Sequence, residues 1–356
     1  MENKENTQIA DSWVFYRRPV TSEIVHITGK ARTVSGNAEW LRHKGFVIAP
    51  FDRSEHRTWF IDAVKNISVH TEYEISELFN DGLKLPSGKS LVKPWREIPR
   101  REYLSLIRQM KQEIENTELE KVVLSRVINV EGVKPVQAVR MFIELCVNYP
   151  NAFVFLFYLP ETGMWLGATP ETLMTGEDNR FKIVSLAGTA NWQPELTFEQ
   201  LWNKKERIEQ QIVTDFVKNV IYDAGIDNYE MKGPETIKAG KLSHLRTIFR
   251  FETEDYDLID RLLDKLHPTP AVCGLPQNKA KELIRDIELY TRNCYTGFIG
   301  PVCDDGLSLY VNLRSLQFTD SGVQLFVGGG ITKFSEPEAE WRETEMKAQT
   351  LLAVIK

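Results

Sequence analysis

The chain carries short runs of β-branched and aromatic residues, which are typical of strands, and these runs are separated by segments of helical periodicity. We expect strands at residues 122–130, 153–158, 308–318 and 323–327. Apolar residues at helical spacing predict helices at residues 103–116, 135–149, 198–222, 279–287 and 337–355. Strands and helices are mixed, and several strands look hairpin-linked. This pattern favours an α+β fold of packed layers over a doubly wound parallel sheet.

The length of 356 residues allows about two domains of roughly 150 residues each, yet no linker divides the chain. The clearest break is the segment 85–100, which contains Pro86, Pro94 and Pro99. We therefore expect a single domain over residues 1–356. Residues 1–99 would form the N-terminal part of its body, and residues 100–352 would carry the chemistry.

Composition places the chain among ordinary globular proteins, with 42% hydrophobic and 26% charged residues. A net charge of −6 argues against a nucleic-acid-binding protein, which usually has a basic excess. No apolar run approaches the roughly 20 residues of a membrane helix, and the polar N-terminus has no secretion signal. The four cysteines are widely spaced and form no zinc motif. We expect a cytoplasmic protein that binds neither nucleic acid nor membrane, although local basic groups could hold a small anion.

The helix expected at residues 198–222 places a carboxylate on its apolar side. The apolar arc of this helix consists of Ile208, Ile212, Val213, Phe216, Val217 and Val220. Glu209 falls near the middle of the arc, and Glu206 lies toward one side of it. A charged carboxylate on a core-facing stripe is costly unless it is paired or binds a metal. Both interpretations remain open: a structural ion pair with a nearby Arg or Lys, or a metal ligand.

A second group of carboxylates lies in the C-terminal helix. Ser335 and Glu338 match a capping box, which predicts where this helix begins. Glu340, Glu343 and Lys347 then form a stripe on one flank of its apolar arc. Such a stripe is compatible with a solvated face that carries a helix salt bridge, and it is also compatible with a site.

The glycine run Gly328–Gly330 precedes this helix, and glycines let backbone N–H groups approach a ligand closely. Glu209 and Glu343, on two different helices, could together hold a hard divalent cation. Coordination by oxygen with few protein ligands suits Mg²⁺, which keeps waters and shares its shell with an anionic substrate.

Two residues are candidates for proton transfer. Lys121 opens a predicted strand, and a lysine in an apolar wall or beside a cation can serve as a base. The alternative is a lysine at a strand end whose ammonium reaches solvent. Glu171 follows Pro170, where it could begin a helix, or it could line a pocket and act as a general acid.

Nine segments in order resemble the chorismate-utilising enzyme family, in particular its isochorismate-forming members. They are LEKVVLSR, WLGATPETLM, SLAGTA, KKERIEQQIV, LHPTPAVCG, YTGFIGPV, VNLRSLQF, GGGI and EPEAEWRETEMKAQTLL, and they cover about 250 residues between residues 100 and 352. The resemblance implies one large domain with two packed antiparallel sheets and helices outside. It also implies chorismate as the substrate and dependence on Mg²⁺.

Roles follow from the resemblance at matching positions only. Lys121 matches the base that activates water, and Glu171 matches the acid that protonates the leaving C4 hydroxyl. Glu209 and Glu343 match the Mg²⁺ ligands, and Glu206 and Glu340 match carboxylates that reach the metal through water. Residues that match substrate contacts are Gly188, Thr189, His244, Tyr295, Arg314, Gly328, Gly330 and Lys347.

The product is narrowed by a few positions. Ala187 stands where relatives that form aminodeoxychorismate have a nucleophilic lysine, and the chain lacks the LLES motif of many anthranilate synthases. The resemblance therefore implies isochorismate, for menaquinone or catechol siderophore synthesis, with salicylate or anthranilate formation as alternatives and a non-catalytic regulator as a distant one. Gln210 replaces a histidine found in many relatives, and we expect it to point away from the metal. We also expect a monomer.

Overall fold

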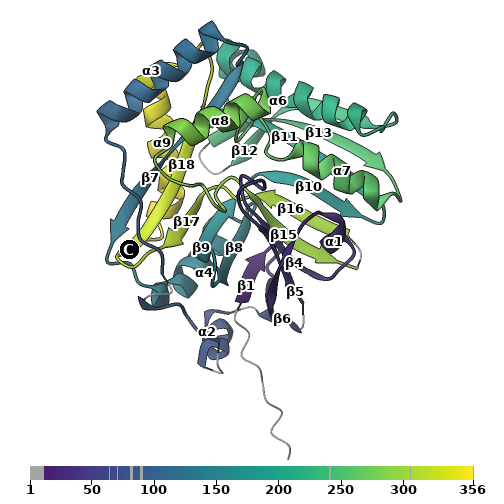
Figure 1. Cartoon of the computed structure of the whole chain (residues 1–356), viewed down its shortest axis with the longest axis vertical. Coiled ribbons are helices and arrows are strands. Elements are labelled where there is room, and N and C mark those ends of the chain that lie inside the picture. Colours follow the sequence, from purple (N-terminus) through teal and green to yellow (C-terminus); the bar gives the residue numbers. More distant parts are fainter. Residues whose placement is uncertain are drawn as a thin grey trace, which may run out of the picture.

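The computed structural model describes residues 12–63, 65–69, 71–80, 83–88, 91–239, 242–304 and 306–355. The prediction that no secretion signal is present concerns mainly residues 1–11, which lie outside the described residues. Two nine-stranded sheets dominate the described part of the chain, and their neighbouring strands pair antiparallel. Figure 1 shows them as two layers with helices on their outer faces. The predicted α+β class is confirmed.

The first sheet contains the strand that begins at Lys121 and the strand that ends in the glycine run. Its order is β14 (Gly274–Leu275), β7 (Lys121–Glu131), β18 (Gly322–Ile331), β17 (Ser315–Phe318), β9 (Gly163–Thr169), β8 (Phe153–Leu159), β1 (Ser12–Arg17), β2 (Ile24–Gly29) and β6 (Lys65–Val69).

The second sheet contains the strands that follow Glu171. Its order is β12 (Glu230–Ala239), β13 (Leu242–Glu252), β11 (Arg180–Asn191), β10 (Thr172–Glu177), β16 (Gly306–Val311), β15 (Phe298–Cys303), β4 (Gly45–Ala49), β5 (Thr58–Asp62) and β3 (Ala31–Val34).

Strand alternation points every second residue into the core between the sheets, and many of these residues are aromatic. In β8, Phe153, Phe155 and Phe157 face the other sheet, whereas Val154 and Leu156 face outward to the helix layer. Phe153 stacks on Tyr310 of the second sheet with ring centroids 4.1 Å apart. These contacts hold the two sheets together beneath the site.

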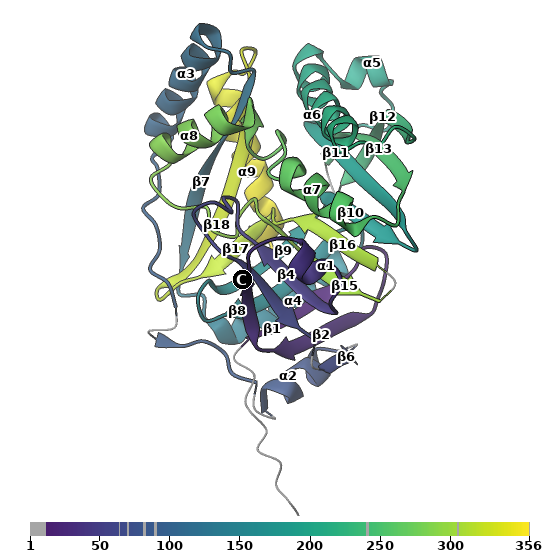
Figure 2. The same cartoon turned by 45° about the vertical axis from the view of Figure 1, so that its right-hand side comes forward.

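Helices cover the outer faces of both sheets. The second sheet is covered by α1 (Ala38–Leu41), α6 (Lys204–Asp223) and α7 (Tyr256–Leu266), and α5 (Phe198–Leu201) precedes α6. The first sheet is covered by α2 (Glu72–Asn80), α4 (Ala138–Asn148, after the 3₁₀ turn Pro135–Gln137) and α9 (Pro337–Leu352), with α3 (Arg100–Asn116) and α8 (Gln277–Ile287) beside β7. In Figure 2, α9 with β7 and β18 lies to one side and α6 with β11 and β13 to the other.

Three sequence predictions are wrong in detail. The strand expected at 308–318 is two strands in different sheets, because Arg314 adopts a φ of 49° and redirects the chain. The helix expected at 198–222 is broken at Trp202, whose buried indole N–H donates to Thr236 Oγ1 at 2.9 Å. The capping box is absent: Glu336 is the N-cap residue of α9, and the Ser335 hydroxyl instead donates to the Gly330 carbonyl at 3.4 Å.

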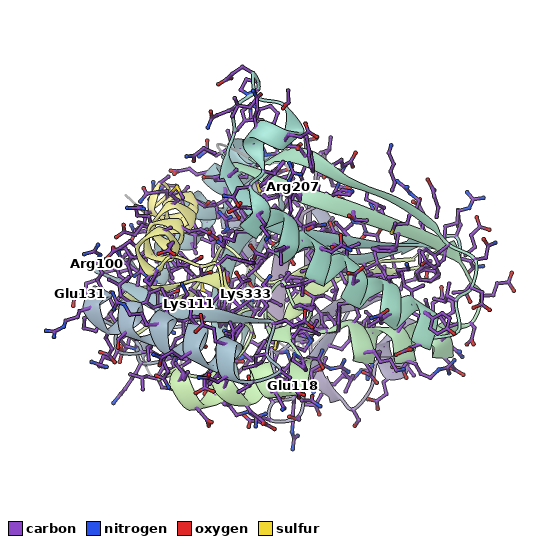
Figure 3. All side chains as sticks on the ribbon, turned by 90° about the horizontal axis from the view of Figure 1, so that it is seen from above. Arg100, Lys111, Glu118, Glu131, Arg207 and Lys333 are labelled. Atoms are coloured by element: carbon purple, nitrogen blue, oxygen red, sulfur yellow. The ribbon has the colours of Figure 1, made fainter. Side chains whose placement is uncertain are left out.

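The outer surface is strongly charged. In Figure 3, seen from above, Arg100 and Glu131 lie near one edge of the molecule, and the exposed residues Glu118 and Arg207 lie inside its outline. None of the helices that the structure describes is long and apolar enough to cross a membrane.

Candidate active site

A cavity of about 80 Å³ lies between the two sheets, and α6 and α9 also contribute to its lining. Among its lining residues are many that the sequence marked as candidates: Glu171, Gly188, Thr189, Glu209, His244, Tyr295, Arg314, Gly328, Gly330, Glu343 and Lys347. The remaining candidates, Lys121, Glu206 and Glu340, lie in contact with this group. Positions from nine separate segments are thus gathered at one place.

Glu171 lies in the short segment by which the chain passes from β9 in the first sheet to β10 in the second. It does not begin a helix, so that alternative is wrong. Its side chain is nearly buried, with 9% of the residue exposed. Burial raises the pKa of Glu171 to about 7, although Lys121, Lys347 and Arg314 act in the opposite direction. A carboxyl group with this pKa can hold a proton near neutral pH and release it in a reaction.

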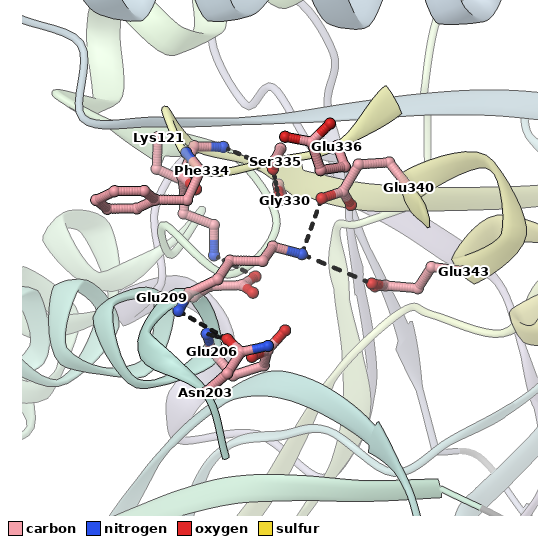
Figure 4. Close-up of polar contacts among 12 residues, drawn as sticks. Lys121, Asn203, Glu206, Glu209, Gly330, Phe334, Ser335, Glu336, Glu340 and Glu343 are labelled. Carbon is pink, nitrogen blue, oxygen red and sulfur yellow. Dashed lines mark hydrogen bonds and ion pairs between the residues drawn. The ribbon is translucent and has the colours of Figure 1, made fainter. Parts of the chain in front are cut away.

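Lys121 begins β7 and is completely buried, so the alternative of a solvent-directed lysine is wrong. Its Nζ lies 3.0 Å from Glu209 Oε1, and Figure 4 shows the two side chains directed toward each other. Gly330 makes this approach possible, because a Cβ there would lie 2.5 Å from Glu209 Oε1 and 2.7 Å from Lys121 Cε. The glycine run thus leaves room for side chains as well as for ligand.

The carboxylates of α9 form ion pairs with lysines from two helices. Lys205 Nζ, from the first turn of α6, lies 2.8 Å from Glu340 Oε1 and 4.0 Å from Glu343 Oε2. Lys347 Nζ lies 2.7 Å from Glu343 Oε1 and donates to the Gly328 carbonyl at 2.9 Å. Figure 4 shows Glu209, Glu340 and Glu343 arranged around this space. Both glutamate-bearing helices therefore meet at one cluster of charge.

The ionisation of the cluster follows from burial and these pairs. Burial would raise the pKa of Glu343, but Lys347 and Lys205 outweigh it and hold that pKa at about 2. For Glu340, burial dominates over the attraction of Lys205, so its pKa is raised. Burial likewise raises the pKa of Glu206. Burial would lower the pKa of Lys205, yet Glu209, Glu340 and Glu343 raise it above the usual range.

A histidine and a glycine turn form another part of the cavity wall. His244 Nδ1 lies 2.9 Å from the Gly188 carbonyl and 3.4 Å from Thr189 Oγ1. Burial, reinforced by Arg314, lowers the pKa of His244 to about 4, so its ring is neutral at neutral pH. Gly188 has a φ of 72°, and a Cβ on it would lie 3.2 Å from the backbone oxygen of Glu206. The turn therefore packs closely on the start of α6.

Arg314 and Tyr295 also line the cavity, on the side where the chain passes from one sheet to the other. Arg314 lies between β16 and β17, and its Nη1 is 3.3 Å from Thr350 Oγ1. Tyr295 is buried and stacks on Phe326, with ring centroids 5.1 Å apart. A guanidinium in this position can bind a carboxylate through two parallel hydrogen bonds.

The carboxylate cluster suits a hard cation by its chemistry. All of its candidate ligands are carboxylate oxygens, and Glu206 Oε2 is buried without a hydrogen-bond donor from the described residues. Lys205 already places a positive group between Glu340 and Glu343. As the side chains stand, no three ligating groups of the described residues converge as a preformed metal site. Carboxylate oxygens are donors that fit Mg²⁺. In this arrangement, the ammonium groups of Lys205 and Lys347 balance the negative charge of the cluster.

Sequence reasoning missed a buried network behind Lys121. Glu288 accepts hydrogen bonds from the Ser125 backbone N–H at 2.8 Å and from Arg292 Nη2 at 2.6 Å. Arg292 also donates to the Val123 carbonyl at 2.8 Å. This network fixes β7 next to the residue that begins it. The i, i+4 spacing of Glu288 and Arg292 was the available signal.

Lys205 was also missed, although it lies within the motif KKERIEQQIV. The signal was its position four residues before Glu209, on the same face of the helix. Gln210, by contrast, points away from the cluster as expected. Its amide nitrogen lies 3.2 Å from the Ser185 carbonyl and 3.3 Å from Thr247 Oγ1, between α6 and the second sheet.

Residues 56–356 match the family model described as chorismate binding enzyme. The chain belongs to this family. It is 31% identical over 245 residues to the isochorismate synthase EntC of Escherichia coli strain K12, covering 67% of this chain and 63% of that protein. It is 30% identical over 261 residues to the isochorismate synthase MenF of the same strain, covering 71% of this chain and 60% of that protein. The aligned segments thus span less than two thirds of these relatives.

Solved structures share the fold over nearly the whole chain. The menaquinone-specific isochorismate synthase MenF from Escherichia coli has a TM-score of 0.78 at 22% identity, covering 98% of this chain and 90% of that one. Anthranilate synthase component I from Streptococcus pneumoniae has a TM-score of 0.70 at 17% identity, covering 98% and 94%. Two packed antiparallel sheets with outer helices are therefore the fold of this family member.

Proposed function

We propose that this protein is an isochorismate synthase that converts chorismate to isochorismate with the help of Mg²⁺. The observation that carries the proposal is the environment of Glu171, a buried carboxyl group whose pKa is raised to about 7 within the cavity that Arg314 and Lys347 also line. The relatives named above are isochorismate synthases at about 30% identity, which supports the same reaction here.

The reaction needs a base and an acid at different places on the ring. Lys121 takes a proton from the water that attacks C2, and both ring double bonds shift as the C4 hydroxyl leaves. Glu171 gives its proton to that hydroxyl, so a second water is released and the overall change is an isomerisation. Lys121 Nζ lies 3.0 Å from Glu209 Oε1, so this contact must open before the amine can face the attacking water.

Substrate binding uses the positive groups of the cavity. Chorismate is a dianion, and Arg314 and Lys347, which line the cavity, would hold its carboxylates. Mg²⁺ would be held by Glu209 and Glu343, with Glu206 and Glu340 behind them, and would neutralise substrate carboxylate charge when bound. The cavity of about 80 Å³ is smaller than the roughly 300 Å³ of typical ligand pockets, so its side chains must rearrange on binding.

Other products remain as alternatives. A salicylate synthase would also eliminate pyruvate, and an anthranilate synthase would use ammonia instead of water. Ala187, which lines the cavity, leaves no lysine there for a covalent route to aminodeoxychorismate. Isochorismate could serve menaquinone or siderophore synthesis; of the relatives named above, the solved MenF is menaquinone-specific.

The test is turnover of chorismate by the purified full chain in MgCl₂ and in EDTA. Chorismate and isochorismate have equal mass, so the products must be separated by chromatography before mass spectrometry. We expect isochorismate with Mg²⁺ and none with EDTA. Salicylate with pyruvate, or anthranilate after addition of ammonia, would replace the proposal by that alternative, and binding without turnover would favour a regulator.

A further inference from the structure

The ammonium of Lys205 lies where a divalent cation would also be expected to bind. This ammonium lies 2.8 Å from Glu340 and 4.0 Å from Glu343. Glu209 is the third carboxylate nearby, and it contributes most among the three to raising the pKa of Lys205. These are the side chains that would surround the divalent ion of the proposed function. A divalent ion and the Lys205 ammonium would repel each other strongly in this space, so they cannot both occupy it.

The three lysines around the cluster differ in how firmly they are held. Lys121 is completely buried in the strand wall, and Lys347 is anchored a second time by the Gly328 carbonyl at 2.9 Å. Lys205 and Lys347 are about equally exposed, but Lys205 has only its ion pairs to the α9 carboxylates and no second anchor on the backbone among the described contacts. A lysine side chain at a helix start is long enough to turn its ammonium to solvent once another cation balances the carboxylates.

The backbone beneath Lys205 is held independently of its side chain. Asn203 caps α6 by accepting the backbone N–H groups of Lys205 at 2.8 Å and Glu206 at 3.4 Å. Figure 4 shows this cap next to Glu206 and Glu209. The ammonium can therefore leave the carboxylates while the helix that carries Glu206 and Glu209 stays in place.

We infer that Lys205 is an internal competitor of the divalent ion: its ammonium neutralises the carboxylate cluster in the metal-free enzyme and must leave Glu340 and Glu343 when the ion binds. Lys205 thus keeps these three crowded carboxylates compatible with the folded state and weakens the affinity for metal. This inference rests on the magnesium site of the proposed function. It makes Lys205 a positioning residue, since it acts through the carboxylates and not on substrate.

Isothermal titration of MgCl₂ into the EDTA-stripped full chain tests the competition. We expect Lys205→Met to bind Mg²⁺ about tenfold or more tightly than the native chain, a change of about 1.4 kcal/mol or more. Its melting temperature in EDTA should fall below that of the native chain and recover with Mg²⁺. Lys204→Met is the matched control, because it removes the same charge from an exposed neighbour that lies over the Phe334 ring and should bind as the native chain does.

Lys205→Arg keeps the positive charge and should bind Mg²⁺ no more tightly than the native chain. Binding by Lys205→Met that is equal to or weaker than native binding would overturn the inference and leave the proposed function standing. If neither the native chain nor Lys205→Met binds Mg²⁺, the proposed magnesium site and the inference fall together.

A measurement on the native chain does not depend on whether a variant folds. Lysine acylation followed by mass spectrometry compares the reactivity of Lys205 in EDTA and in MgCl₂, with Lys204 as the internal control. We expect Lys205 to be protected in EDTA and to react several-fold faster with Mg²⁺, while Lys204 is unchanged. Equal or lower reactivity of Lys205 with Mg²⁺ would contradict its displacement.

Discussion

Glu171 and Arg314 lie side by side at two points where the chain passes from one sheet to the other. The Val311 backbone N–H donates to the Glu171 carbonyl at 2.9 Å, and the Ala168 N–H donates to the Arg314 carbonyl at 3.1 Å. The two crossings thus run next to each other at the cavity wall. Backbone that leaves a sheet need not alternate, so both side chains can turn to the same cavity, one as an acid and one as a carboxylate-binding group.

The acid role of Glu171 predicts a loss of turnover in Glu171→Gln, which has nearly the same shape but cannot donate an acidic proton. We expect kcat to fall by about 10²–10⁴-fold. In the native chain, kcat/KM should decrease as the pH rises through about 7, because the proton is then lost from Glu171. A pH–rate profile measures this, and a profile that stays flat between pH 6 and about 8.5 would refute the assignment.

The same group predicts how the free energy of unfolding depends on pH. The pKa of Glu171 is raised on folding from 4.5 to about 7, so the folded chain binds the proton more tightly than the unfolded one. Its contribution to stability is therefore lost as pH rises through this window, by about 3 kcal/mol at most. Urea unfolding at pH 5 and pH 8 should show a smaller difference for Glu171→Gln than for the native chain.

The base role of Lys121 predicts a variant that binds substrate without converting it. We expect Lys121→Ala to retain chorismate affinity within about tenfold, while isochorismate formation becomes undetectable, since Arg314 and Lys347 remain to hold the dianion. Titration calorimetry and product chromatography measure the two properties. Lys204→Ala is the control for lost charge, and substantial residual turnover by Lys121→Ala would end the base assignment.

A single methyl group at Gly330 should separate Lys121 from Glu209, because its Cβ would lie 2.5 Å from Glu209 Oε1. We expect Gly330→Ala to lower kcat by about a hundredfold, the usual cost of displacing catalytic groups by about 1 Å. Gly36→Ala is the control, since a Cβ there meets nothing within 4 Å. Steady-state kinetics of the two variants should differ strongly, and equal activities would show that the close packing at Gly330 does not matter.

The buried network behind Lys121 predicts a large effect on folding. Arg292→Met leaves the Glu288 carboxylate buried without its guanidinium partner, which lies 2.6 Å away in the native chain. We expect a loss of about 3–5 kcal/mol in the free energy of unfolding. Arg180→Met breaks an exposed ion pair with Glu252 and should cost less than about 1 kcal/mol. Denaturant titration compares them, and equal losses would contradict the structural role.

Much of the local structure could be predicted, because the pattern of apolar residues repeats within a single helix or strand. Runs of β-branched and aromatic residues located β7 and β8, and helical spacing located α3, α4, α8 and α9 within a few residues. The predictions failed where a distant contact broke the pattern. Trp202 leaves the helical path to reach Thr236, and Arg314 turns the chain between sheets. Periodicity reports the faces of one element and carries no signal for such contacts.

The sequence by itself determined the family, the fold class and the set of residues that gather at the cavity, because ordered motifs retain chemistry that a fold must bring together. Only the tertiary structure decided which charges face each other. It placed Lys121 against Glu209, set Lys205 among the α9 carboxylates and buried Glu171 at a sheet crossing. The physical reason is that burial and ion pairing depend on distances between elements far apart in the chain, and residue spacing does not encode those distances.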